Sequence, residues 1–475
     1  MLNIFRLCIT LAVVTSTFSY GEVSDKPLNV LLITADDMNN DSSGWRGSPV
    51  KTTPHLDRFA ATAHRFVNHH VTVAICQPSR SAIFTGRVPH RSGALGFDPI
   101  NTDVPTLVEV LKSSGYYTAI INKVPHLEPK EKFPWDQRLN DSGKNPKAIR
   151  RDVEQTLAEA KGKPFFINVN ITDPHRPFPG SNQEEQKKEK GKKKAVVASS
   201  NEPKNYKPEE IVVPSFLEDI PLVREEVAQY YSGISRFDAS FGEILDALSK
   251  SGLEDNTLVI FLSDHGMSFP FSKATVYRNG TLSPVLLHWP GQPEAAVNET
   301  LVSSVDILPT ILDILSVKPL EGVDGQSLLP LIRGEKQQNR DFVITHINTV
   351  VSKKSFPQRC IRTKDVAYQF HAWPNGKPQF KVEAMSGITF QALADAAKTD
   401  PRIQKRVDQY IVGTKESFFD VKNDPDERVN LIDDPSRQAE IQRLKKLLLE
   451  SMERTNDPLL DEFRKEFPAG KNPNA

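Results

Sequence analysis

The sequence predicts an α/β fold in which a mostly parallel central sheet is flanked by helices and followed by a smaller C-terminal unit. Apolar runs typical of buried strands alternate with segments of helical periodicity. Several of these runs end directly in polar residues, and the strand ends of open parallel sheets are where such folds place ligands. Beyond Gly334 the segments become shorter and are separated by turn residues, which predicts a small antiparallel sheet with a helix packed on it.

Size and charge narrow the classes of function. The 475 residues, 38% hydrophobic and 25% charged, are enough for a large core and a second, smaller unit. We expect a catalytic domain at 26–335 and a C-terminal α+β subdomain at 336–475. Sixty basic residues balance sixty acidic ones, so no overall field attracts nucleic acid or an anionic membrane. We therefore expect no nucleic-acid partner.

The first residues, 1–21, are typical of a signal peptide. Arg6 closes a short basic region, Leu7 to Val14 is apolar, and small residues follow. A buried N-terminal helix is the alternative, which the polar segment after Gly21 disfavours. The apolar stretch is well short of the roughly 20 residues that a spanning helix needs, so no membrane anchor is expected. We expect export: periplasmic or secreted in a bacterium, lysosomal or secreted in a eukaryote.

The first central strand is predicted at Leu28 to Thr34, a continuous apolar run of the kind buried on both faces of a parallel sheet. The following periodic segments predict helices at His55 to Phe66, Pro78 to Thr85 and Pro105 to Ser114, and then a strand at Tyr117 to Ile121.

Two later strands are predicted at Pro164 to Ile171 and Thr257 to Leu262. Between them lies a long amphipathic helix whose apolar stripe we assign to the core: Val227, Tyr230, Ile234, Phe237, Phe241, Ile244 and Leu248. The charged, low-complexity segment Gln183 to Lys194 is predicted to be a solvated surface loop. It could instead bind a polyanion, but its lysines are interleaved with glutamates.

The predicted C-terminal unit has four recognisable parts. They are strand-like segments at Phe342 to His346 and Cys360 to Phe370, a turn at Pro374-Asn375-Gly376, and a closing amphipathic helix near Arg437 to Met452.

Cys76 opens a C-x-P-x-R pattern in a chain with almost no other cysteine. Only Cys76 and Cys360 follow the predicted signal peptide, so a disulfide framework is excluded. Pro78 suits a first helical turn, which places the Cys76 side chain at a helix N-terminus, where backbone N–H groups and Arg80 favour an anion such as sulfate or phosphate. The alternative is a small buried thiol at a helix start. Cys360 lacks such surroundings and is expected to be a spectator thiol.

Carboxylates follow two of the predicted strands. Asp36-Asp37 comes after the first strand, and Asp264-His265 follows Thr257 to Leu262. Alone, each pair could be a helix cap or a turn. Together, three carboxylates and an imidazole at converging strand ends can hold a hard divalent cation such as Ca2+ or Mg2+.

Cations and imidazoles follow strand ends as well. Lys123 and His126 follow Ile121, His175 follows Ile171, and Lys273 comes after the Asp264-His265 pair. Each residue alone is more often a solvated lysine or a hydrogen-bonded histidine. Placed together, they would surround a tetrahedral anion.

In these motifs the chain resembles the formylglycine-dependent type I sulfatases of the alkaline-phosphatase superfamily. Within that family it looks most like the sulfamidase subfamily, which acts on N-sulfoglucosamine. The matching motifs are Asp36-Asp37, Cys76 to Arg80 continuing through Thr85-Gly86, Asp173-Pro174-His175-Arg176, Ser263-Asp264-His265-Gly266 with Phe269-Pro270, Phe419-Asp420, Asp424-Pro425 and Asn430-Leu431.

The resemblance implies a set of roles. Cys76 would be converted to formylglycine by a formylglycine-generating or anaerobic maturation enzyme. One hydroxyl of the aldehyde hydrate would attack sulfur, and the other would later expel sulfate. The resemblance also implies that Asp36, Asp37, Asp264 and His265 bind Ca2+ together with the modified Cys76, that Arg80 and Lys123 hold the hydrate, that His126 is the base in the breakdown step, and that Lys273 and His175 neutralise sulfate and protonate the leaving group.

The chain departs from the family pattern at two positions. Members commonly have one residue between the lysine and the histidine, whereas here two residues separate Lys123 from His126. Sulfamidase-like members carry asparagine after the metal aspartate, whereas this chain has His265, as do iduronate-type sulfatases.

Our leading hypothesis from the sequence is a sulfatase that removes the N-sulfate of glucosamine from heparan-type glycosaminoglycan, with sulfated carbohydrate as its partner. The alternatives are an O-sulfatase of the iduronate-2-sulfatase type, a phosphate or phosphonate ester hydrolase on the same fold, and a non-catalytic carbohydrate-binding relative in which Cys76 stays a thiol. His90, Arg91 and His346 are candidate contributors to leaving-group recognition. The sequence does not predict the oligomeric state.

Overall fold

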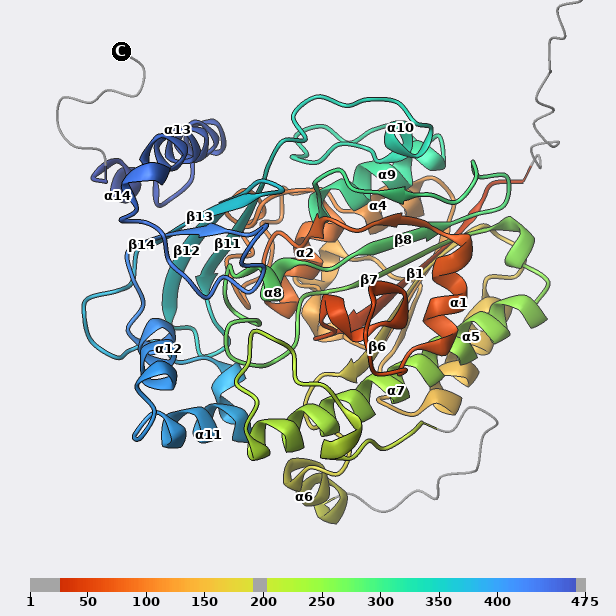
Figure 1. Ribbon diagram of the computed structural model, residues 1–475. Helices are drawn as coiled ribbons and strands as arrows, with labels where there is room; N and C mark the ends of the chain where they lie inside the picture. The colour runs from red at the N-terminus through yellow and green to blue at the C-terminus, as the bar shows by residue number, and fades with distance from the viewer. Residues whose placement is uncertain (1–25, 191–202, 467–475) are drawn as a thin grey trace, which may run out of the picture.

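The computed structural model describes residues 26–190 and 203–466 (Figure 1). The predicted signal peptide at 1–21 lies outside the described residues, as does the end of the charged segment, 191–194. Within the described ranges, no helix combines the length and the apolar character that crossing a membrane requires.

The central sheet has eight strands in the order β5-β4-β6-β1-β7-β8-β2-β9. All neighbours from β5 to β7 run parallel, and β8 is antiparallel to both of its neighbours. The strands are β1 Asn29–Asp36, β2 His64–Phe66, β4 Tyr117–Ile121, β5 Gln137–Leu139, β6 Phe165–Pro174, β7 Thr257–Ser263, β8 Val285–His288 and β9 Val297–Asn298; β3 His69–His70 and β10 Val302–Ser303 form a separate pair. The predicted mostly parallel sheet is confirmed.

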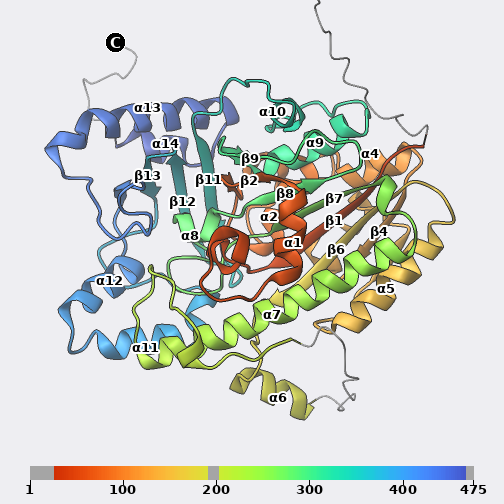
Figure 2. The same cartoon turned by 45° about the vertical axis from the view of Figure 1, so that its right-hand side comes forward.

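Helices cover both faces of this sheet (Figures 1 and 2). The buried residues of β1 alternate between the two faces: Leu31 and Ile33 belong to the core under α1, α5 and α7, whereas Val30 and Leu32 belong to the core under α2, α4 and α9. This alternation explains why the strand reads as a continuous apolar run, since neither of its faces meets water.

The helices of this part are α1 Pro54–Thr62, α2 Cys76–Thr85, α3 Pro89–Ser92, α4 Leu107–Ser113, α5 Pro146–Glu159, α6 Asn182–Lys190, α7 Pro221–Lys250, α8 Arg278–Thr281, α9 Ile307–Ile314 and α10 Leu329–Ile332. The long helix α7 buries the predicted apolar stripe against the sheet, and its Phe237 and Phe241 rings contact Phe261 of β7. The stripe is therefore core, as predicted.

A second sheet occupies the C-terminal part of the chain, with four antiparallel strands in the order β11-β12-β13-β14. Helix α13 packs on it through Leu444, Leu448 and Met452, which share a core with Tyr368 and Phe370. The elements are β11 Val343–Thr349, β12 Ser355–Arg362, β13 Val366–His371, β14 Glu416–Asp420, α11 Ile388–Ala396, α12 Pro401–Ile411, α13 Gln438–Thr455 and α14 Leu460–Arg464. The predicted antiparallel sheet with a helix is confirmed, and the boundary between 335 and 336 stays a prediction.

Three local predictions were wrong. The first helix ends at Thr62 instead of Phe66, because residues 64–66 form β2 and bury Phe66 beside β8. Residues 360–370 belong to two strands with a turn between them. The charged segment begins as helix α6 and not as a loop, because its Glu, Gln and Lys residues are good helix formers and Ser181 accepts a hydrogen bond from the Glu184 N–H.

Candidate active site

The candidate site lies where four neighbouring parallel strands end. Strands β4, β6, β1 and β7 are adjacent in the sheet, so their carboxyl ends share one edge. Asp36 is the last residue of β1, and Asp264, Lys123 and His175 follow the other three strands within two residues. The topology thus brings together side chains that are far apart in the sequence.

The backbone at these strand ends is unusual. Asp37, Asn122 and Lys123 have φ values of 67°, 58° and 54°, in the left-handed region that residues other than glycine seldom adopt. Such conformations persist where the surrounding structure enforces them, and they cluster at functional sites. Here they turn the chain sharply after β1 and β4, which keeps the Asp37 and Lys123 side chains at the sheet edge.

Helix α2 supplies the next two residues, as the sequence predicts. Cys76 is its first residue, and Arg80, one turn later, is only 1% exposed. The Arg80 guanidinium donates hydrogen bonds to Thr34 Oγ1 at 2.9 Å, to Asn170 Oδ1, and to Asp264 Oδ2 at 2.9 Å. The strand residues therefore hold Arg80 rigidly.

Two overlapping sets of side chains can hold a metal ion: Asp36, Cys76 and Asp264, and Asp37, Cys76 and His265. In each set the ligand atoms lie within 4.8 Å of one another, and all five residues are buried. Among the described residues, Asp36 Oδ1 has no hydrogen-bond partner. A buried carboxylate oxygen left in this way is a reason to expect an ion, and the oxygen-rich donor set fits a hard cation.

His265 is oriented for ligation. Its Nδ1 lies 2.9 Å from the carbonyl oxygen of Gly266, which can only accept, so Nδ1 carries the proton. Nε2 therefore keeps its lone pair, and it lies 3.2 Å from Cys76 Sγ and 3.4 Å from Asp37 Oδ1. This fixed tautomer is the one that a metal-binding histidine needs.

Cations balance the buried carboxylates. The Lys273 Nζ atom donates to both oxygens of Asp37 at 3.0 Å, and Lys123 pairs with Asp36. Burial alone would raise the pKa of Asp36, but Lys123 and other nearby cations hold that pKa well below 3.8. Burial likewise opposes the charge of Lys273, yet Asp37 raises the pKa of Lys273 well above 10.5. The site thus keeps both signs of charge at neutral pH.

The two imidazoles differ in their surroundings. His126 ends the 3-10 turn Val124–His126, and its ring contacts Phe97 at a centroid distance of 6.0 Å. Burial, with the neighbouring charges of Lys123 and Arg80, lowers the pKa of His126 to about 3. The two residues between Lys123 and His126 lie in this turn. The His175 Nδ1 atom lies 2.7 Å from the Arg176 carbonyl oxygen, which leaves Nε2 directed elsewhere.

The structure adds residues that sequence reasoning missed. Thr34 and Asn170 hold Arg80, and they are polar positions inside otherwise apolar strands, which was the available signal. Glu383 lies in a 3-10 turn of the C-terminal part, 3.1 Å from Lys273 Nζ and 3.5 Å from His175 Nε2. No local pattern in the sequence pointed to Glu383, because only the packing of the C-terminal part brings it to the site.

The candidate leaving-group residues form a different cluster. His90 and His346 lie with Asp457, and their rings are 5.6 Å apart. Arg91 pairs with Asp324. Cys360 is buried in β12, and burial raises the pKa of its thiol to about 12, which fits a spectator thiol.

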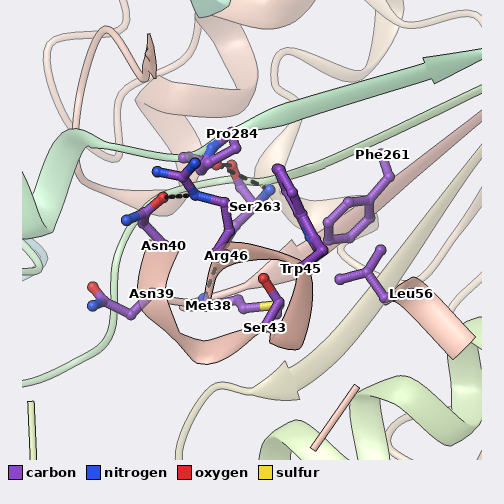
Figure 3. A pocket seen from close by; sticks show the side chains of 11 residues that line it. Met38, Asn39, Asn40, Ser43, Trp45, Arg46, Leu56, Phe261, Ser263 and Pro284 are labelled. Atoms are coloured by element: carbon purple, nitrogen blue, oxygen red, sulfur yellow. Dashed lines mark hydrogen bonds between the residues drawn. The ribbon is translucent and has the colours of Figure 1, made fainter. Parts of the chain in front are cut away.

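A small pocket lies beside the Asp36-Asp37 loop (Figure 3). It is lined by Met38, Asn39, Asn40, Ser43, Trp45, Arg46, Leu56, Phe261, Ser263, Ser283 and Pro284. Its walls are mainly apolar, and Arg46 turns to Asn40 at 2.9 Å. None of the predicted sulfate-binding residues lines it. The pocket therefore borders the loop that carries the carboxylates without being the predicted anion site.

A carboxylate-rich centre beside cations and imidazoles, at the ends of parallel strands, is typical of hydrolases that act on tetrahedral oxyanions. The sulfatase family profile matches residues 28–317, and the chain belongs to the sulfatase family. It is a hydrolase of sulfate esters or sulfamates. A second profile, N-sulphoglucosamine sulphohydrolase, C-terminal, matches residues 264–378.

Three known proteins place the chain among its relatives. It is 29% identical to the human N-sulphoglucosamine sulphohydrolase over 470 residues, 91% of each chain. A solved structure of an enzyme with its substrate D-glucosamine-2-N,6-O-disulfate matches with a TM-score of 0.69 at 18% identity, over 92% of this chain and all of that one. The phosphonate monoester hydrolase of Agrobacterium radiobacter matches with a TM-score of 0.67 at 18% identity, over 90% and 96%. The solved structures confirm the alkaline-phosphatase-like fold.

Proposed function

We propose that this protein hydrolyses the N-sulfate of glucosamine at the ends of heparan-type chains. One observation carries the proposal: the N-sulphoglucosamine sulphohydrolase C-terminal profile begins at Asp264 and runs to residue 378. That segment includes the ligand pair Asp264-His265 and the cation Lys273. The likeness to the human enzyme along 91% of both chains supports the same substrate.

We assign a divalent metal, Ca2+ with Mg2+ as the alternative, to Asp36, Asp37, Asp264, His265 and the residue at position 76. When bound, the ion would supply positive charge that favours a deprotonated oxygen nucleophile. The carboxylate oxygens of the set and the lone pair of His265 Nε2 fit this role. Imidazole is a softer ligand than a carbonyl oxygen, so the chain's preference for Ca2+ over other divalent ions is weaker than in an all-oxygen site.

Cys76 is assigned as the residue that a maturation enzyme converts to formylglycine. The aldehyde hydrate would supply a geminal diol, one hydroxyl for attack on sulfur and one for expulsion of sulfate. Residue 76 is the first residue of α2, lies beside the proposed metal ligands, and precedes Arg80 by one helical turn. The helix N-terminus favours negative charge at this point.

The other side chains divide the remaining work. Arg80 and Lys123 would hold the hydroxyl groups at position 76. Lys273, whose ammonium group is buried beside Asp37, would neutralise sulfate oxygens. His126 would accept a proton during release of sulfate, and burial with the charges of Lys123 and Arg80 lowers its pKa in the free enzyme, so this step would need that pKa to rise. His175 would donate a proton from Nε2 to the leaving amine in its imidazolium form, in which Nδ1–H is donated to the Arg176 carbonyl oxygen and Nε2 also carries a proton.

Incubation of the purified enzyme with N-sulfoglucosamine tests the proposal, with inorganic sulfate and glucosamine measured together. We expect the two products in equal amounts. Sulfate release from a 2-O-sulfated iduronate or a 6-O-sulfated sugar, with none from the N-sulfate, would move the assignment to an O-sulfatase. We further propose that residues 1–21 direct export, which N-terminal sequencing of the mature protein checks.

A phosphonate or phosphate ester hydrolase is the second candidate, and the structural likeness to the phosphonate monoester hydrolase favours it. The same helix N-terminus and cations suit either tetrahedral anion. Turnover of matched aryl sulfate and aryl phosphonate esters decides between them.

A further inference from the structure

Glu383 is a carboxylate from the C-terminal part of the chain that reaches two of the proposed sulfate-binding groups. Its Oε2 lies 3.1 Å from Lys273 Nζ, and its Oε1 lies 3.5 Å from His175 Nε2. The proposed mechanism gives this residue no role. A carboxylate beside groups that are proposed to bind sulfate needs an explanation, because its negative charge would repel the negative charge of sulfate.

The position of Glu383 is fixed by a network beneath it. Glu226 of α7 accepts hydrogen bonds from the N–H groups of Ile388 and Thr389, at the start of α11. The same carboxylate pairs with Arg176 at 2.5 Å, and Arg176 directly follows His175. Gly387 lies against this pair, since a Cβ there would meet Glu226 Oε1 at 2.2 Å. The segment that carries Glu383 is therefore tied to the segment that carries His175.

Exposure separates Glu383 from Lys273, whereas the His175 side chain is exposed to a similar extent as Glu383. The Lys273 side chain is 3% exposed and Asp37 is fully buried, whereas the Glu383 side chain is 30% exposed. The carboxylate thus stands on the solvent side of Lys273 and beside the Nε2 atom proposed to protonate the leaving group. The part of a substrate that leaves after sulfate transfer would lie next to it.

We propose that Glu383 is a specificity-determining residue that favours a leaving group which becomes a cation over one which carries an anion. The inference rests on the proposed function. In sulfamate cleavage the nitrogen first takes a proton from His175 Nε2 and becomes positively charged. The N–S bond then breaks, the sulfuryl group passes to the nucleophilic oxygen, and the electron pair of the broken bond stays on nitrogen. The amine formed takes a second proton from solvent and leaves as an ammonium ion.

A fixed carboxylate stabilises positive charge that develops on the nitrogen. A 2-O-sulfated uronate would instead bring its own carboxylate against Glu383 and be repelled. Glu383 would therefore make the enzyme prefer N-sulfated glucosamine over 2-O-sulfated uronate, the two substrates between which the sequence does not decide. In the free enzyme the Glu383 carboxylate already interacts in this way with a cation, the Lys273 ammonium group.

The first test is Glu383→Gln, which removes the charge and keeps the shape. We expect kcat/KM for N-sulfoglucosamine to fall about tenfold, since the interaction is partly screened by solvent. Hydrolysis of a neutral aryl sulfate should change by less than about twofold, because its leaving group never becomes a cation. Glu450→Gln, at an exposed carboxylate on α13, is the matched control. An equal loss on both substrates, or a loss on neither, overturns the inference.

A second measurement does not need turnover of the N-sulfate. Glucosamine carries an ammonium group where glucose has a hydroxyl group. Each sugar can be tested as an inhibitor of aryl sulfate hydrolysis. We expect glucosamine to inhibit the parent enzyme more strongly than glucose, and E383Q to lose that difference. If the parent enzyme releases no sulfate from N-sulfoglucosamine but still prefers glucosamine, the proposed function fails and the inference stands. Equal inhibition by both sugars overturns the inference.

Discussion

The His265 Nε2 atom lies 3.2 Å from the Cys76 Sγ atom, although the two residues are 189 positions apart in the sequence. Helix α2 brings one of them and the loop after β7 brings the other. The contact places an oriented imidazole against the residue proposed to carry the nucleophile. His265 is therefore placed both to bind the proposed metal ion and to position the residue at 76.

Replacement of His265 should weaken both functions together. We expect His265→Ala to lower bound divalent metal and kcat by at least about 10-fold each, because loss of one ligand weakens the site. His265→Asn should keep part of both, since an amide oxygen can ligate a hard cation. Metal content by elemental analysis and sulfate release are the measurements. His288→Ala is the control, and metal content unchanged in His265→Ala would refute the assignment.

Cys76 is expected to carry no thiol in enzyme from a host able to make formylglycine. Mass spectrometry of the peptide that contains Cys76 should show an aldehyde in place of the thiol. Cys76→Ala should lower kcat by roughly 10³-fold or more, as removal of a nucleophile does, with a loss of stability like that of any buried cysteine truncated to alanine.

Cys360→Ala is the matched variant for Cys76. Cys360 is fully buried in β12, so we expect this change to cost about 1 to 2 kcal/mol of stability through the cavity it leaves, with kcat preserved. A reversed pattern, with activity lost only in Cys360→Ala, would contradict the proposed centre.

Gly266 is expected to tolerate no side chain. A Cβ there would meet the Asn279 carbonyl oxygen at 1.9 Å and Ser272 Oγ at 2.6 Å, closer than any ordinary contact. The backbone must then move, at a cost of about 1 to 3 kcal/mol, and it would displace His265, whose Nδ1 bonds to the Gly266 carbonyl. Gly266→Ala should therefore lose both thermal stability and metal. Gly291→Ala is the control for backbone strain without a clash: nothing lies within 4 Å of the added Cβ, but φ is +76°, so this variant should lose stability and keep its metal.

Sequence reasoning found the parts of the site that follow strand ends. Asp36, Lys123, His175 and Asp264 could be predicted because parallel strands end at one edge and polar residues there interrupt an apolar pattern. Periodicity also identified the stripe of α7 as core. Each of these predictions depends only on local pattern and on one rule of topology.

The remainder depended on packing between distant segments. Glu383 reaches the site only because Glu226 and Arg176 dock the start of α11 against the catalytic part. Residues 64–66 continue the apolar spacing of α1, but pairing with β8 outweighs helix propensity. His90 and His346 are separated by 256 positions, and their common partner Asp457 gave no local signal.

Removal of one partner of the ion pair between Arg359 and Asp457 should strongly destabilise the protein. Both side chains are buried, and the guanidinium donates to the two carboxylate oxygens at 2.6 and 2.8 Å. Asp457→Asn leaves Arg359 buried without its counter-charge, which costs about 3 to 5 kcal/mol. Chemical denaturation at pH 7 measures this. Asp461→Asn is the control, because the Asp461 side chain is 93% exposed; equal stability of both variants would show that the pair contributes little.

His346 should make stability depend on pH in the mildly acidic range. Burial, together with the charges of Arg359 and His90, lowers the pKa of His346 well below 6.5, although Asp457 and the Thr72 backbone act in the opposite direction. The unfolded chain therefore binds a proton at a higher pH than the folded one, so the free energy of unfolding falls as pH drops below 6.5. One such group contributes at most about 1.4 kcal/mol per pH unit. His90, whose pKa burial also lowers, adds to the slope. His346→Gln should therefore show a shallower loss of stability between pH 6.5 and pH 5 than the parent, measured by denaturant titration, and parallel slopes for the two proteins would contradict the assignment.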